Sequence, residues 1–295
     1  MVEAASGVRT FSPKAFKEAV KIRADYHALP LAGGTDLMVK YRKPAGNLPD
    51  FKNPVIFIGQ LDELKYIETD SKVSGEILHI GSGTKLSALL ENAYIPEILK
   101  EAVSQIAAPG IRNMATIGGN ICNSSPAGDT IPVLYCLDAV LVLTSENGER
   151  EVAVDNFIKG PGKNDLKSDE LLREIKFPLK NFDRILYRKV GTRKANALSK
   201  LSFAGFARLD AGKIEDLKIA FGAVAPVVIR SQEIEKTIVG KNQSEISKGL
   251  AEIKKNYGRL IRPIDDQRST AVYRKETALK LLEYFLAYAV WAEQL

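Results

Sequence analysis

Two glycine-containing segments carry the residue types best suited to binding a ligand through the backbone. The first is Ala32-Gly33-Gly34-Thr35-Asp36-Leu37, directly after an apolar run at 29–32. Paired glycines allow positive φ angles and bring no side chain, so consecutive N–H groups can approach a phosphate closely. A helix that starts after the glycines would add a favourable dipole. Taken alone, the pattern still favours a plain tight turn between a strand and a helix, because glycine is the usual residue there.

The second segment, 111–129, combines glycines with short hydroxyl, amide and carboxylate side chains. Such a composition suits hydrogen bonding to a large, polyhydroxylated and phosphorylated cofactor. An irregular loop would have a similar composition, but a loop of this length in a compact domain is usually functional or disordered. Apolar segments on both sides argue against disorder. The segment is therefore predicted to bind a cofactor.

Other motifs exclude several kinds of chemistry. Gly81-Ser82-Gly83-Thr84-Lys85-Leu86 has leucine where the dinucleotide fingerprint needs its third glycine, and Gly162-Lys163-Asn164 lacks the rest of a P-loop. Neither supports a Rossmann fold or an NTPase. Cys122 and Cys136, with two histidines, are too few for a zinc or iron–sulfur site within this chain. His79 lies in an apolar strand pattern and is predicted to be structural.

The elements that must position these segments are read from apolar periodicity and from turn residues. A helix is predicted from Ser12-Pro13 to about Asp25, with Ser12 as its N-cap. The other predicted elements of this half are strands at 29–32, 55–58, 77–81 and 139–144, a helix start at 37, and helices at 86–91 and 96–107. A strand ending at Pro178 marks the predicted domain boundary. Beyond it we predict an antiparallel meander over 201–209 and 217–224, then helices at 245–257 and 269–293.

Length, composition and charge bound the class of protein. The chain has 295 residues, of which 45% are hydrophobic and 26% charged, as expected for about two packed domains. No apolar run reaches the roughly 18 residues of a membrane span, and 1–11 has no signal-peptide core, so a cytoplasmic protein is expected. Residues 1–177 hold 20 Lys+Arg and 23 Asp+Glu, a net charge of −3, whereas 178–295 hold 22 and 13, a net of +9. The basic excess is confined to one half and forms no run, which argues against nucleic acid as a partner.

Together, in this order and about eighty residues apart, Ala32–Leu37 and Ala115–Asp129 resemble the FAD-binding subunit of the molybdenum-containing hydroxylases, the relatives of xanthine dehydrogenase and carbon monoxide dehydrogenase. Later segments are similar to that family as well, so the resemblance covers essentially the whole chain: Lys163–Pro178, Tyr187–Arg193, Ala220–Arg230 and Asp265–Arg274. The sequence is most similar to the separate FAD chain of bacterial xanthine-dehydrogenase-type enzymes.

The resemblance implies an α+β fold. A PCMH-type FAD-binding domain of two α/β subdomains would occupy 1–177, and a smaller domain with an antiparallel sheet and helices would occupy 178–295, with the flavin held between them. The residues implied to wrap the FAD pyrophosphate are Pro30, Leu31, Ala32, Gly33, Gly34, Thr35, Asp36 and Leu37. The residues implied to form a second backbone cradle are Thr116, Ile117, Gly118, Gly119 and Asn120.

Four further positions are implied by the resemblance alone. Asp129 would hydrogen-bond the sugar-alcohol part of FAD, and Ile106 stands where a relative packs an aromatic residue on the cofactor. Leu172 matches an apolar residue near the flavin or adenine, although a core position explains it equally well. Lys189 matches a lysine that reaches the FAD, where a cation would stabilise reduced anionic flavin. Without the resemblance, a solvated lysine on a basic face would be the preferred interpretation.

The implied function is electron transfer. FAD on this chain would take electrons from two [2Fe-2S] clusters on a small partner subunit and pass them to NAD⁺ or another acceptor. A large subunit with a molybdenum cofactor would oxidise the substrate, which would be xanthine or another purine, another N-heterocycle, an aldehyde or CO. The complex would be a dimer of heterotrimers. No nucleic-acid partner, membrane span or metal site is expected on this chain. The alternatives are a stand-alone PCMH-fold flavin oxidoreductase, a reductase that acts directly at the flavin as cell-wall sugar reductases do, and a nucleic-acid-binding protein.

Overall fold

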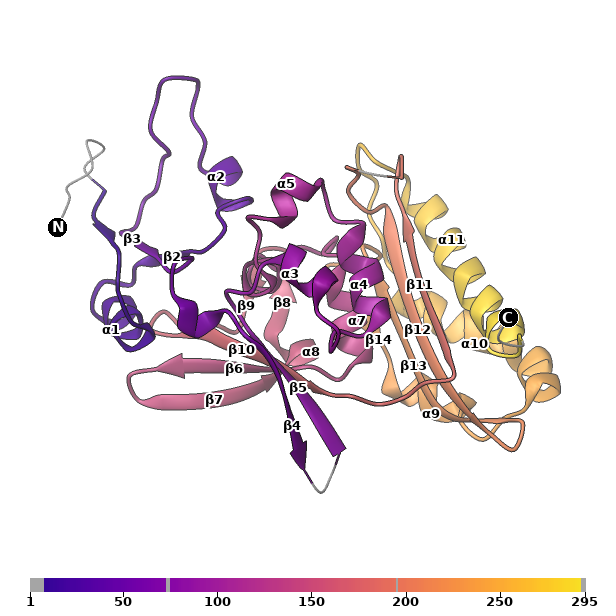
Figure 1. The fold of residues 1–295 in the computed structure, drawn as a ribbon. Coiled ribbons are helices and arrows are strands. Elements are labelled where there is room, and N and C mark those ends of the chain that lie inside the picture. Colours follow the sequence, from indigo (N-terminus) through magenta and orange to yellow (C-terminus); the bar gives the residue numbers. More distant parts are fainter. Residues whose placement is uncertain (1–7, 73–74, 195, 293–295) are drawn as a thin grey trace. The chain divides into compact units, whose positions relative to one another are not determined.

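The computed structural model describes residues 8–72, 75–194 and 196–292, which form two compact units (Figure 1). The first unit contains the described residues up to 95 together with 108–124 and 139–178, and the second contains 96–107, 125–138 and the described residues from 179 onward. The chain therefore passes between the units several times. The sequence domains 1–177 and 178–295 stay a prediction.

The first unit begins with a small parallel sheet of order β1-β3-β2, built from β1 (Thr10–Phe11), β2 (Leu29–Leu31) and β3 (Val55–Phe57). Helix α1 (Phe16–Tyr26) covers it by packing Phe16, Ala19 and Val20 onto the sheet's Ile56. The prediction that Ser12 caps this helix is wrong. The helix begins at Phe16, because the Phe16 N–H donates to the carboxylate of Glu63 from another part of the chain.

A second sheet of five antiparallel strands has the order β4-β5-β10-β6-β7. Its strands are β4 (Ile67–Lys72), β5 (Gly75–Gly81), β6 (Val140–Ser145), β7 (Gly148–Ala153) and β10 (Leu171–Pro178). The predicted strands at 77–81 and 139–144 and the strand end at Pro178 are confirmed. The unit is completed by α2 (Leu37–Lys40), η1 (Asp62–Leu64), α3 (Leu86–Glu91), α5 (Pro109–Arg112), α6 (Ile117–Cys122), α8 (Val154–Phe157), β8 (Ile158–Gly160) and β9 (Lys163–Asn164).

Helix α6 is absent from the sequence prediction, which describes 111–129 by its loop-forming composition. The helix forms because Thr116 caps it, with its Oγ1 accepting from the Gly119 N–H, and because Ile117 and Ile121 are fully buried on one side. Two glycines in a six-residue helix conceal this signal. Six residues of the predicted cofactor loop are therefore regular structure.

The second unit is a four-stranded antiparallel sheet between helices (Figure 1). The strands are β11 (Arg184–Val190), β12 (Leu201–Asp210), β13 (Lys213–Gly222) and β14 (Ile229–Arg230), and the helices are α4 (Glu97–Ser104), α7 (Thr130–Cys136), α9 (Gln232–Ile238), α10 (Gln243–Leu260) and α11 (Ala271–Tyr284). The predicted meander is confirmed. The last predicted helix is shorter than expected: α11 ends at Tyr284 and is followed by a π-helical turn, η2 (Phe285–Ala289), while residue 293 lies outside the described residues.

The core of the second unit lies between the sheet and helices α10 and α11. Phe203 contacts both Phe221 and Phe285 edge-on, and Tyr257 packs on Phe221. Gly205 is required on β12, because a Cβ there would lie 2.7 Å from the Phe285 ring. Helices α4 and α7 contact the strands from the other face (Figure 1). None of the helices in the described part of the chain has the length and apolar character needed to cross a membrane.

Candidate functional site

The first glycine segment connects β2 to α2 and leaves a row of amide donors without partners. Gly34 has φ = 72°, which a side chain would strain. The backbone N–H groups of Ala32, Gly33, Gly34 and Thr35 donate no hydrogen bond within the described residues, although all four residues are half-buried. Buried amides normally find an acceptor. Unbonded amides in a glycine-containing turn are donors that an anion could accept from, and the anion-binding role of this segment stays a prediction.

The structure brings the two glycine segments into backbone contact within the first unit. A Cβ added to Gly33 would lie 2.0 Å from the carbonyl oxygen of Met114 and 3.0 Å from the Ala115 Cα. Only glycine permits this approach. The Asn123 side-chain amide also donates to the Asp36 carboxylate, with an Nδ2–Oδ2 distance of 3.0 Å. Residues 32–36 and 114–123 therefore form one structure.

The second segment differs from the first because its own amides are already bonded. The Ile117 N–H donates to the Thr84 carbonyl at 3.0 Å and the Gly118 N–H to the Ser82 carbonyl at 2.9 Å. The Gly119 N–H donates to Thr116 Oγ1 at 3.1 Å and the Asn120 N–H to the Thr116 carbonyl at 2.9 Å. The backbone N–H groups that remain unbonded in this unit's predicted site thus belong to the first glycine segment. The second glycine segment packs against the first.

Residues 81–85, which resemble a dinucleotide motif but lack its third glycine, form a third part of this structure. Rejecting a Rossmann fold is correct, because these residues leave an antiparallel strand, β5. Their glycines allow neighbouring backbone to approach closely, because a Cβ on Gly81 would lie 2.4 Å from the Leu64 carbonyl oxygen. Gly118 packs so closely against Ser82 that no side chain fits there: a Cβ on Gly118 would lie 2.6 Å from the Ser82 carbonyl oxygen. The two glycines at 81 and 83 are the sequence signal from which this close backbone packing could have been predicted.

Leu172, on β10, is joined to the same structure. The Ser82 hydroxyl donates to the Leu172 carbonyl at 2.6 Å, and the Ser82 N–H donates to the carbonyl of the next residue, Arg173, at 2.9 Å. The Leu172 side chain is 5% exposed. Its burial agrees with a core position and leaves its predicted contact with the cofactor a prediction.

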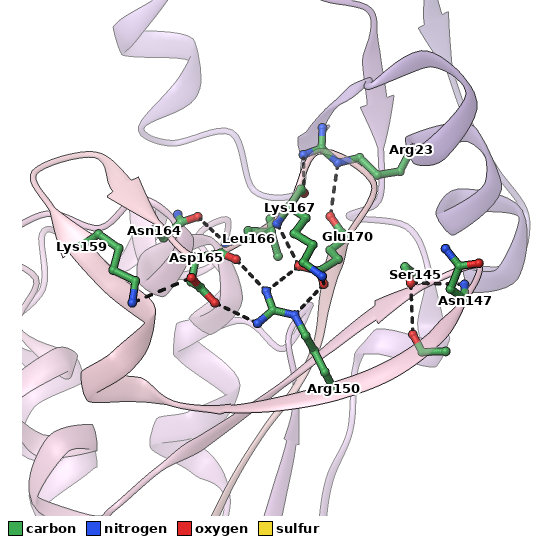
Figure 2. Close-up of polar contacts among 11 residues, drawn as sticks. Arg23, Ser145, Asn147, Arg150, Lys159, Asn164, Asp165, Leu166, Lys167 and Glu170 are labelled. Atoms are coloured by element: carbon green, nitrogen blue, oxygen red, sulfur yellow. Dashed lines mark hydrogen bonds and ion pairs between the residues drawn. The ribbon is translucent and has the colours of Figure 1, made fainter.

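A polar network fixes the segment that leads into Leu172 (Figure 2). Arg150 on β7 forms a two-pronged ion pair with Glu170, with Nε–Oε1 at 2.6 Å and Nη2–Oε2 at 2.8 Å, and its Nη1 donates to Asp165 at 2.8 Å. Burial alone would raise the pKa of Glu170, but the hydrogen bonds from Arg150 and from the Lys167 N–H outweigh it and hold the pKa below its ordinary value. Sequence reasoning missed all of these residues, because nothing local marks them.

Two further side chains tie this segment to the glycine structure. Arg23 on α1 donates to the Ala28 carbonyl at 2.8 Å, just before β2, and also to the carbonyls of Glu170 and Lys167 (Figure 2). Burial lowers the pKa of Arg23. At the other end, the Asn164 amide donates to the Cys122 carbonyl at 2.8 Å, where α6 ends.

In the second unit, the predicted residues Asp129 and Lys189 form a buried ion pair. The Lys189 ammonium donates to Asp129 Oδ2 at 2.7 Å and to the Gln105 carbonyl at 2.8 Å, and the two side chains are 6% and 7% exposed. The interpretation of Lys189 as a solvated lysine is therefore wrong. Ser199 also donates to the Asp129 carboxylate, and Tyr187 does so at 3.4 Å. Burial raises the pKa of Asp129, and the ammonium and both hydroxyls oppose that rise.

The remaining predicted residue of this unit, Ile106, is half-buried and follows Gln105, the C-cap of α4, and its N–H donates to the Val103 carbonyl. The second unit thus holds Ile106, Asp129 and Lys189, while the first holds 30–37, 116–120 and Leu172. The cofactor contacts of each set stay predictions.

The two thiols and His79 have structural surroundings. Burial raises the pKa of Cys122 to about 12 and also raises that of Cys136. His79 hydrogen-bonds through Nδ1 to Glu174 at 2.9 Å, within the five-stranded sheet. Across the described residues, no three His, Cys, Asp or Glu side chains come together as a metal site.

Comparisons with known proteins agree with this architecture. The family model for the FAD binding domain in molybdopterin dehydrogenase matches residues 6–180, and that for the CO dehydrogenase flavoprotein C-terminal domain matches 186–289. The chain is 32% identical to the glyceraldehyde dehydrogenase medium chain of Sulfolobus acidocaldarius over 269 residues, 89% of this chain and 91% of the relative. It is 35% identical to the xanthine dehydrogenase FAD-binding subunit of Escherichia coli O157:H7 over 75% of each chain. Among solved structures, a chain of the reconstituted CO dehydrogenase from Oligotropha carboxidovorans aligns with a TM-score of 0.85 at 25% identity, covering 98% of this chain and 99% of that one.

Proposed function

The chain belongs to the FAD-binding subunits of the molybdenum hydroxylases, the family of the xanthine and carbon monoxide dehydrogenases, and on this premise we propose that it binds FAD as the electron-transfer subunit of such a complex. The observation that carries the proposal is the row of unbonded amides at 32–35, held against the second glycine segment. Successive N–H groups in a turn suit the oxygens of a diphosphate. The residues present therefore fit the cofactor that the family binds.

The chain's residues would bind and orient the cofactor, while FAD, when bound, supplies the redox chemistry. The amides of Ala32–Thr35 would hold the diphosphate. The segment 116–120, fixed by residues 82 and 84, would keep those amides in position. Asp129 would accept a hydrogen bond from a sugar-alcohol hydroxyl, and Ile106 and Leu172 would supply apolar contacts. Lys189 would place a positive charge near the flavin, and its ion pair with Asp129 would reduce the effect of that charge.

Electrons would reach the FAD from partner subunits. Two cysteines cannot supply the four thiolates of a cluster, and Cys122 and Cys136 belong to different compact units. We therefore assign two [2Fe-2S] clusters to a small partner subunit and a molybdenum cofactor to a large one, in a dimer of heterotrimers. The FAD would pass the electrons on to NAD⁺ or to another acceptor. The substrate would be xanthine or another purine, another N-heterocycle, an aldehyde or CO, and would be oxidised on the large subunit.

The first experiment is a titration of the full-length chain with FAD, followed by flavin fluorescence. We expect saturable binding of one FAD per chain. Gly34→Val should weaken binding about ten-fold or more, because a β-branched residue resists φ = 72°. Gly110→Val is the matched control, because no atom lies within 4 Å of a Cβ at that position. A wild-type chain that binds no FAD would refute the proposal.

The alternative, a stand-alone flavin oxidoreductase of the same fold, is tested by size-exclusion chromatography of the native protein from its source. The proposed subunit should elute with a large and a small partner chain and with molybdenum and iron in the same fractions. Elution as a free flavoprotein that turns over a substrate by itself would favour the alternative.

A further inference from the structure

We propose that Lys85 is a cofactor-binding residue that pairs its ammonium group with the diphosphate of FAD at the junction of the two glycine segments. The inference rests on the proposed function, because it takes FAD as the ligand. Neither the glycine motifs nor the resemblance assigns a role to this lysine.

The position of Lys85 follows from contacts on both its backbone and its side chain. It directly precedes α3, and its backbone pairs with Thr116, the N-cap of α6, in an isolated β-bridge. Its Nζ donates to the carbonyl oxygen of Met114 at 2.9 Å. That oxygen is also the atom that a Cβ on Gly33 would approach to 2.0 Å. A single carbonyl oxygen thus separates the ammonium from the Gly33 backbone.

The charge of Lys85 is uncompensated. No ion pair to Lys85 occurs within the described residues, whereas nearby Lys65 pairs with Asp62, with Nζ–Oδ1 at 2.9 Å. Lys85 is half-buried, and burial together with the positive charge of Lys65 lowers its pKa. An ammonium offers three donors, of which the Met114 carbonyl takes one. A partly desolvated cation with free donors favours an anion as its partner.

The unbonded amides at 32–35 indicate which anion fits. Dipoles of N–H groups and an ammonium that meet beside one backbone junction are complementary to a phosphate group, which carries charge and several acceptor oxygens. Lysine acts at such sites as a point charge without the fixed fork of arginine. The inference therefore concerns charge, and a neutral donor at position 85 should not replace it.

The test measures the FAD dissociation constant of the full-length chain by fluorescence titration at low and high salt. Lys85→Gln keeps a donor for the Met114 carbonyl but removes the charge, and should weaken FAD binding about ten- to a hundred-fold, as expected for a lost charge-assisted hydrogen bond. The salt dependence of binding should decrease as well. Lys85→Arg should retain most of the affinity, and Lys65→Gln, the control, should remain within about two-fold of wild type.

The outcomes separate the two proposals. Wild-type affinity in Lys85→Gln would overturn the role of Lys85 while leaving FAD binding in place. Equal losses in Lys85→Gln and Lys85→Arg, matched by equal losses of thermal stability in the FAD-free proteins, would assign Lys85 a structural hydrogen bond and also overturn the inference. A wild-type chain that binds no FAD would overturn the proposed function and this inference together.

Discussion

Replacing Arg150 by methionine should destabilise the first unit by removing the only guanidinium bonded to the side-chain carboxylate of Glu170 within the described residues. The Glu170 side chain is 4% exposed and that of Arg150 is 31% exposed. Methionine preserves much of the apolar stem of arginine but none of its donors. The variant therefore leaves a buried carboxylate without its main partner.

The size of the effect follows from this geometry. Removing one partner of a buried ion pair costs about 3–5 kcal/mol. The Lys167 N–H still donates to Glu170 Oε2 at 2.8 Å, and the partly exposed site admits water. We therefore expect a loss of about 2–3 kcal/mol, which corresponds to a decrease in Tm of about 4–12 °C for a unit of this size.

The loss should depend on pH in a direction set by Glu170. Its pKa is held below the ordinary value in the folded protein, so its ion pair contributes stability above the unfolded-state pKa of about 4.3 and that contribution is lost as the pH falls through the folded pKa. In the variant, protonation relieves the buried charge. The difference in unfolding free energy between wild type and Arg150→Met should thus be greatest near neutral pH and decrease below about pH 4.

Urea unfolding at neutral and acidic pH, followed by circular dichroism, measures this difference. The control is Glu151→Gln on the same strand, whose partner Lys176 lies 2.6 Å away but whose side chain is 57% exposed. An exposed pair contributes about 0–1 kcal/mol. The reasoning is refuted if the two variants lose equal stability, or if the loss in Arg150→Met is independent of pH.

Two further predictions concern the predicted cofactor residues. Gly33→Ala should lower both FAD affinity and Tm, because its Cβ would lie 2.0 Å from the Met114 carbonyl oxygen. The control variant Gly110→Ala should change neither quantity. Equal FAD titrations and equal melting curves for the two variants would contradict the close approach of Gly33 to Met114. Lys189→Met should lower the flavin reduction potential by leaving the Asp129 carboxylate unpaired, and Asp129→Asn should raise it by freeing the ammonium. Dye-coupled redox titration measures both, and shifts of the same sign, or no shift, would contradict a position near the flavin.

Much of the fold could be predicted from the sequence because its signals are local. Apolar alternation located β5, β6, β12 and β13, and helical periodicity located α3, α4 and α10. Where a distant residue completes an element, the prediction failed. Helix α1 begins at Phe16 because Glu63 accepts its first N–H, and α11 gives way to a π-turn where Phe285 packs on β12 and Phe203.

For the candidate site, the sequence by itself determined the two glycine segments, because paired glycines reveal a backbone requirement wherever they occur. Only the tertiary structure decided which amides are free, those of 32–35, and which are bonded, those of 117–120. It also revealed Lys85 beside Met114, Arg150 beside Glu170, and Lys189 buried on Asp129. These partners lie 20 to 60 residues apart in the chain. Hydrogen bonds between such residues exist only after packing has brought them together, so no local pattern in the sequence records them.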